Sequence, residues 1–210
     1  MKVTSVSKYK GSTYEVELDY ERRIYLHAEI IADFGVRTDM ELDQAELRRI
    51  IYASNFRRAY QRALYLLDIR DYSCKEMSDK LIGTYKNERL CAAVIEKLKS
   101  IGALNDERYA EKLARKYVEV KRFGCRRAKR EMMLRGIGQF LAEDALEQYT
   151  ETFAENLAEL LRGKYARFLT DSSDRKQTER VKSSLVRSGY SFDEINRAVR
   201  EYFDQQQEEG

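Results

Sequence analysis

The residues best suited to chemistry in this chain are the lysines and arginines between positions 108 and 135. That stretch holds eleven Lys or Arg against three Glu, a local excess of eight positive charges in a chain whose formal net charge is +3. A purely structural helix usually relieves such repulsion with Glu four residues away, and few acids are interleaved here. The stretch therefore predicts binding to a polyanion, with a solvated helix face as the structural alternative. The charge alone does not identify the anion.

The spacing of these cations predicts two helices that present them on one exposed surface. On a helix over 105–122, positions 108, 112, 115 and 122 form one stripe, while Ala110, Leu113, Ala114 and Tyr117 face inward. After a break at 123–124, a second basic helix turns Ala128 inward. The predicted contacts to a polyanion are Arg108, Lys112, Arg115, Lys121, Arg122, Arg126, Arg127, Lys129 and Arg130.

Motifs for catalysis or metal binding are absent from the sequence. There is no phosphate-binding GxxxxGK[ST] loop, no HExxH and no nucleophile elbow, and the single histidine, His27, has no ligand-like neighbours. The three cysteines, Cys74, Cys91 and Cys125, show no CxxC spacing. We expect a non-enzymatic protein without catalytic residues, bound metal or cofactor.

The N-terminal residues have the alternating pattern of half-buried strands. Apolar and polar residues alternate over 13–18 and again over 23–30, with Asp19 to Arg22 as the turn between them. Together with Val3 to Val6, they predict a small antiparallel hairpin or three-stranded sheet within residues 1–37.

From residue 38 onward the apolar residues recur at helical intervals. They predict one or two helices between 41 and 68, then helices over 74–83 and 88–100, the first of which starts at a Ser73–Glu76 capping box. Further capping boxes are predicted at Thr152–Glu155, Asp174–Gln177 and Ser191–Glu194.

One apolar pattern occurs three times, with its turn residue at Tyr85, Ile137 and Tyr190. Each copy ends a helix, crosses a tight turn and starts another helix, and each follows a leading helix, over 55–68, 105–122 and 152–168. Units of this size bury little surface alone, so neighbours should stack. We therefore predict a mainly α fold, an elongated curved array of three tandem three-helix repeats with the small N-terminal sheet.

Four segments follow from this organisation. They are an N-terminal β-region (1–37), a linker helix with the first repeat (38–104), the basic second repeat (105–150), and the third repeat with an acidic tail (151–210) whose end, from Asp204, should be frayed.

The composition favours a soluble protein. With 36% charged residues and neither Pro nor Trp, it suits long solvated helices, and no apolar run approaches the length of a membrane span. We expect a cytoplasmic monomer without a membrane partner.

Two segments of this sequence resemble the RecX family of bacterial regulatory proteins. They are GALNDERYA at 102–110 and KRFGCRRAKREMMLRGI at 121–137, and the similarity extends over roughly 55–203. The chain departs from the family pattern at Cys125, where Pro is frequent, and at Ala103, where an aromatic residue is frequent. Both differences alter helix-end packing more than charge.

The resemblance implies a non-enzymatic modulator of the RecA recombinase, active in DNA repair, recombination and the SOS response. Family members bind the RecA filament on single-stranded DNA, lodge in its groove, and suppress ATP hydrolysis, strand exchange and filament growth. The implied partners are the RecA filament, single-stranded DNA and, more weakly, duplex DNA.

Two other classes stay open at this point. A helix, tight turn and helix within a three-helix unit is also how helix-turn-helix proteins read duplex DNA, and such a protein would act without RecA. A scaffold that recognises only protein would show no salt-dependent affinity for DNA.

Overall fold

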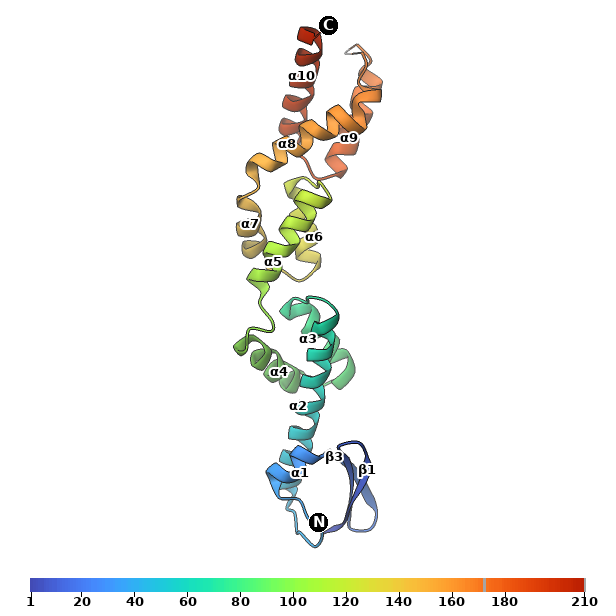
Figure 1. Cartoon of the computed structure of the whole chain (residues 1–210), viewed down its shortest axis with the longest axis vertical. Coiled ribbons are helices and arrows are strands. Elements are labelled where there is room, and N and C mark those ends of the chain that lie inside the picture. Colours follow the sequence, from blue (N-terminus) through green and yellow to red (C-terminus); the bar gives the residue numbers. More distant parts are fainter. Residues whose placement is uncertain (172, 210) are drawn as a thin grey trace. The chain divides into compact units, whose positions relative to one another are not determined.

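The structure, a computed structural model, describes residues 1–171 and 173–209 (Figure 1). It is mainly helical with one small three-stranded sheet at the N-terminus, which confirms the predicted fold class in those respects. The chain divides into two compact units. The first comprises residues 1–70 and 77–103, and the second comprises residues 71–76 and those from 104 onward. The finer division into four segments stays a prediction.

An antiparallel sheet of order β1-β2-β3 opens the first unit. In its register Val6 lies opposite Val16, and Val16 lies opposite Ile24. Val16 and Leu18 are fully buried, as the period-two pattern predicts. The strands are β1 (Val3–Lys10), β2 (Thr13–Leu18) and β3 (Arg22–His27).

The strand predicted over 23–30 is wrong beyond His27, because residues 28–34 form helix α1 (Ala28–Phe34). His27 is its N-cap, and the imidazole Nδ1 accepts a hydrogen bond from the Glu29 N–H at 3.2 Å. Gly35 ends the helix in the left-handed conformation, with φ of 61°. Apolar and polar residues continue to alternate past His27, but the N-cap at His27 and the C-cap at Gly35 make this segment a helix.

A single long helix, α2 (Gln44–Ile69), fills the region where one or two helices were predicted. It begins at a capping box formed by Asp43 and Glu46. Its first turns join the sheet core through Leu47 and Ile50, whereas the small buried residues Ala59 and Ala63 lie further along. Helices α3 (Cys74–Tyr85) and α4 (Glu88–Ser100) follow, and α4 packs on α2.

The second unit contains two successive helix trios, each with its own buried core. In each trio the leading helix ends in a π-helical turn. The first trio is α5 (Asp106–Arg115) with η1 (Lys116–Val120), α6 (Cys125–Leu134) and α7 (Gln139–Glu147). The other is α8 (Thr150–Leu160) with η2 (Leu161–Tyr165) and the short η3 (Ala166–Phe168), then α9 (Arg175–Arg187) and α10 (Phe192–Glu209).

The predicted helix starts at Ser73 and Ser191 are confirmed. In the Ser191 box the hydroxyl accepts from the Glu194 N–H at 3.3 Å, and the Glu194 carboxylate accepts from the Ser191 N–H at 2.7 Å. The predicted start at Thr152 is wrong: only two residues separate the end of α7 from the start of α8 at Thr150, so Thr152 lies inside the helix.

Fraying of the C-terminal residues stays a prediction. Helix α10 continues through them to Glu209, while Gly210 lies outside the described residues. Their Gln- and Glu-rich sequence has good helix propensity, which explains why the helix continues beyond the last core residues, Val199 and Tyr202.

Candidate nucleic-acid and filament interface

Helix α5 places its cations on the solvent side, as predicted. The Asn105 side chain accepts from the Arg108 N–H at 2.9 Å and so fixes where the helix begins. Ala110, Leu113 and Ala114 are buried in the trio core. Because those positions define the inner face, the side chains of Arg108, Lys112 and Arg115 are exposed.

The π-helical turn η1 changes the predicted path between Lys116 and Arg122. A π turn inserts one extra residue, so residues beyond it no longer keep the α-helical register of α5. Arg122 then adopts a positive φ of 51°, and its guanidinium forms an ion pair with Glu159 of α8 at 2.8 Å. The structure therefore removes Arg122 from the single stripe that ideal helical spacing predicts.

Helix α6 buries Ala128 and Met132, as predicted, and exposes Arg126 and Arg130. The other two cations of this helix are half-buried. The Arg127 guanidinium lies 3.9 Å from the centre of the Phe123 ring, where a cation–π contact holds it. Arg127 is also 3.8 Å from the Glu131 carboxylate.

Much of the local positive charge is neutralised by carboxylates from elsewhere in the sequence. Ion pairs of exposed side chains each stabilise the fold by roughly 0.2–1 kcal/mol, so a phosphate can replace the carboxylate. In the absence of a ligand, however, the pairs reduce the positive electrostatic potential of this surface. Counting charges within 108–135 missed the partners that lie outside this stretch, because the fold supplies them. The pairs with such partners are Lys112–Asp71 (2.9 Å), Arg122–Glu159, Lys129–Glu143 and Arg135–Glu76 (3.2 Å), whereas Arg115–Glu119 (3.2 Å) and Arg127–Glu131 are i,i+4 pairs within the stretch.

Arg126 and Arg130 differ from that group. In the described part of the chain neither has a carboxylate within 4.0 Å, and both line a shallow surface cavity of about 500 Å³. Met133 and Leu134 line the same cavity and are 43% and 69% exposed. Exposed cations of this kind can contact the phosphate backbone of a single strand.

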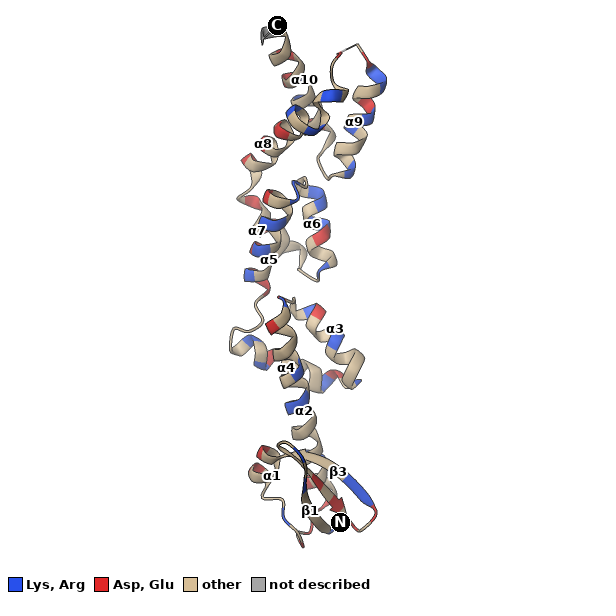
Figure 2. Ribbon diagram, turned by 45° about the vertical axis from the view of Figure 1, so that its right-hand side comes forward, with Lys and Arg blue, Asp and Glu red and all other residues tan. Residues whose placement is uncertain are grey.

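Helix α9 carries a second set of cations that sequence reasoning missed. Lys176, Arg180 and Arg187 occupy positions i, i+4 and i+11, which is one helical stripe, and Arg175 lies beside them. All four are exposed, and in the described part of the chain none is within 4.0 Å of a carboxylate. They line a shallow cavity of about 610 Å³, and α9 carries more blue than red in Figure 2.

The repeat alignment could have revealed this helix. Val181 and Leu185 of α9 correspond to Ala128 and Met132 of α6, and all four are buried. The outer faces of the two helices therefore correspond as well. The third copy as a whole carries both acids and bases, so its overall charge did not indicate a basic helix. Among the residues that line the α9 cavity, Glu179 is the acidic one, and it is paired with Lys182 at 3.2 Å.

The arrangement has the chemistry of a polyanion contact. Guanidinium and ammonium groups on α6 and α9 can donate to phosphate oxygens. Within residues 1–171 and 173–209, no three His, Cys, Asp or Glu side chains gather as a metal site. None of the helices described there is both long and apolar enough to cross a bilayer.

Family profiles and solved structures of known proteins match this chain over its three-helix units. The family profile described as the first three-helix domain of RecX matches residues 59–98, and the profile of its second three-helix domain matches residues 105–146. A crystal structure of RecX from Lactobacillus salivarius is 30% identical, with a TM-score of 0.66, over 71% of this chain and 97% of that one. These matches place the chain among regulatory proteins built from tandem three-helix domains. The chain belongs to the RecX family.

Other relatives match over most of both chains. Regulatory protein RecX of Bacillus pumilus (strain SAFR-032) is 28% identical over 99% of this chain and 80% of its own length. Regulatory protein RecX of Clostridioides difficile (strain 630) is 24% identical over 94% of this chain and 93% of its own. A second crystal structure of a RecX protein, 21% identical with a TM-score of 0.74, shares the fold over 95% of this chain and 98% of that one.

Proposed function

We propose that this chain is a non-enzymatic regulator of homologous recombination and DNA repair that binds the RecA filament on single-stranded DNA. It acts in the cytoplasm as a monomer and inhibits the RecA ATPase, strand exchange and filament growth. Family membership supports the regulatory role. The proposed binding to nucleic acid rests on one observation. Two helices at corresponding positions of successive repeats, α6 and α9, expose cations that have no carboxylate partner among the described residues.

The nine residues predicted from sequence stay the proposed contact set, and α9 extends it. Among the nine, Arg126 and Arg130 are the strongest candidates because their donors are not engaged by a carboxylate within the described residues. Lys121 is exposed at the end of η1. The ion-paired cations contribute when phosphate displaces their carboxylates.

A helix-turn-helix protein that reads duplex DNA without RecA is less well supported. In such a motif the second helix enters the major groove. Helix α7 occupies that position after α6 and carries Glu143, Asp144 and Glu147 but no Lys or Arg. Those carboxylates would face the phosphates that line the groove.

The test is RecA-dependent ATP hydrolysis on single-stranded DNA, titrated with this protein. We expect hydrolysis to fall with added protein, and the Arg126→Glu/Arg127→Glu/Arg130→Glu variant to inhibit less. Unchanged hydrolysis with the wild-type chain would refute the regulatory role. Full inhibition and binding by the triple variant would refute only the assigned surface.

A further inference from the structure

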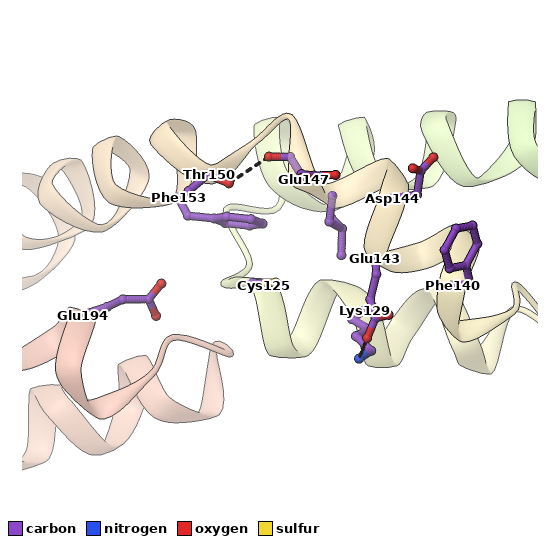
Figure 3. A pocket seen from close by; sticks show the side chains of 10 residues that line it. Cys125, Lys129, Phe140, Glu143, Asp144, Glu147, Thr150, Phe153 and Glu194 are labelled. Atoms are coloured by element: carbon purple, nitrogen blue, oxygen red, sulfur yellow. Dashed lines mark hydrogen bonds and ion pairs between the residues drawn. The ribbon is translucent and has the colours of Figure 1, made fainter.

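A groove on the second unit has the opposite character to the cationic helices. It begins as a cavity of about 470 Å³, and side chains from α6, α7, α8 and the start of α10 converge on it (Figure 3). Leu146 and the Phe153 ring, both buried against the trio core, form its floor. Phe140, at the start of α7, is 77% exposed beside it.

The groove continues along α8 and α10. A second cavity of about 390 Å³ shares Thr150, Phe153 and Glu194 with the first, so the two hollows are joined. Its further floor consists of small or apolar side chains, which let the backbone of a bound segment approach closely. They are Ala154, Leu157, Ala158 and Ala198.

Carboxylates form the rim of this groove, which we call the acidic groove. Six acids line the two cavities against two cations, Lys129 and Arg197. Lys129 is already engaged in its ion pair with Glu143. Among the described residues, Asp144 and Glu147 have no cation within 4.0 Å. The six acids are Glu143, Asp144, Glu147, Glu151, Glu194 and Glu201.

We propose that the acidic groove binds a helical segment of a partner protein whose apolar stripe is flanked by Lys and Arg. The apolar floor suits the stripe of an amphipathic helix, and the carboxylate rim suits its flanking cations. Nucleic acid is a poor occupant, since clustered carboxylates repel phosphate. The net charge of the whole chain is +3, so the local excess of acid at this groove is opposite in sign to that of the chain.

This inference rests on the proposed function, because it assigns the segment to RecA. A filament presents both phosphate and protein, and each of the two surfaces contacts one of them. The cations of α6 and α9 face the nucleic acid, whereas the acidic groove faces the recombinase. Charge complementarity then selects a basic segment of the RecA subunit.

The experiment compares two charge-reversal variants for binding to RecA without DNA and to single-stranded DNA without RecA. Asp144→Lys/Glu147→Lys reverses the rim, and Glu155→Lys/Asp204→Lys makes the same net change at exposed positions outside both cavities. We expect the rim variant to bind RecA at least tenfold more weakly and the control variant to bind it as wild type does. Both should retain their affinity for single-stranded DNA.

A second measurement uses the wild-type chain and avoids any effect of substitution on folding. Cys125 is exposed and lines the acidic groove, so its alkylation by N-ethylmaleimide reports occupancy. Saturating RecA should slow that reaction at least fivefold, as followed by peptide mass spectrometry. An unchanged rate would overturn the proposal.

The remaining outcomes separate the two hypotheses. Equal RecA binding by wild type and the rim variant would overturn the groove assignment while leaving the proposed function intact. Failure of the wild-type chain both to bind RecA and to inhibit its ATPase would overturn both. Self-association of the wild-type chain that the rim variant abolishes, measured by sedimentation, would make a second copy the occupant and overturn the assignment to RecA.

Discussion

Gly124 and Gly189 meet backbone to backbone in the second unit. The Gly124 N–H donates to the carbonyl of Ser188 at 2.8 Å, and a Cβ added to Gly124 would lie 2.4 Å from the carbonyl carbon of Gly189. Gly189 itself has a φ of 98°, which side-chain-bearing residues rarely adopt. The N-terminus of α6 therefore packs directly on the turn between α9 and α10, which joins the two trios.

Substitution of Gly124 should weaken this junction. Backbone cannot move aside as a flexible side chain does, so we expect Gly124→Ala to lower the free energy of unfolding by at least about 1–3 kcal/mol. Gly163→Ala is the matched control, because a Cβ there meets nothing within 4 Å. Urea unfolding of both variants checks the prediction, and an equal loss in the two would contradict it.

One buried amide donates a hydrogen bond to the π-helical turn η1. Asn156 of α8 is buried, and its Nδ2 donates to the carbonyl of Val118 at 3.0 Å. Asn156→Ala should cost about 1–3 kcal/mol of stability, because that buried carbonyl loses its donor. Asn156→Asp should cost more, since a carboxylate has no N–H and faces the carbonyl with negative charge. Thermal unfolding of the two variants ranks them, and the opposite order would refute this role.

Periodicity and capping in the sequence were sufficient to predict most helices and the sheet. Local rules failed where a cap decided the structure, as at His27, whose imidazole starts a helix inside an alternating pattern. They failed again in η1, because neither the Val118 carbonyl nor its distant donor Asn156 leaves a local signal.

The candidate site was less predictable than the fold. Its cations could be located in the sequence. The net charge of the surface they form could not be predicted, because Asp71, Glu143 and Glu159 approach them only in the folded chain. The acidic groove could not be predicted at all. Its rim combines residues from α7 with Glu194 of α10, and no spacing in the sequence connects them.

Tyr190 should make stability depend on alkaline pH. Its hydroxyl donates to the carbonyl of Arg122 at 3.1 Å, and burial raises its pKa well above the ordinary value of about 10. Above pH 10 the unfolded chain releases this proton while the folded chain retains it. Stability from this group is thus complete below pH 10 and falls by about 1.4 kcal/mol per pH unit above it.

Tyr190→Phe removes both the hydrogen bond and the titration. We expect it to cost about 1 kcal/mol at pH 8, and to flatten the decline of stability between pH 10 and 11 relative to wild type. Denaturant unfolding at several pH values measures both effects. Parallel curves for the two chains would show that the Tyr190 proton is not retained on folding.

Helix α9 should contribute phosphate contacts that can be counted by their salt dependence. We expect Lys176→Gln/Arg180→Gln to reduce affinity for single-stranded DNA and to flatten the slope of log affinity against log salt by about 1.4, or roughly 0.7 for each lost contact. Arg48→Gln/Arg49→Gln is the matched control, because it removes two exposed cations from α2 in the first unit. Fluorescence anisotropy with a labelled oligonucleotide at four salt concentrations gives both slopes. Equal flattening by the two variants would mean that net charge alone governs binding, whereas flattening confined to the α9 variant assigns the contacts to that helix.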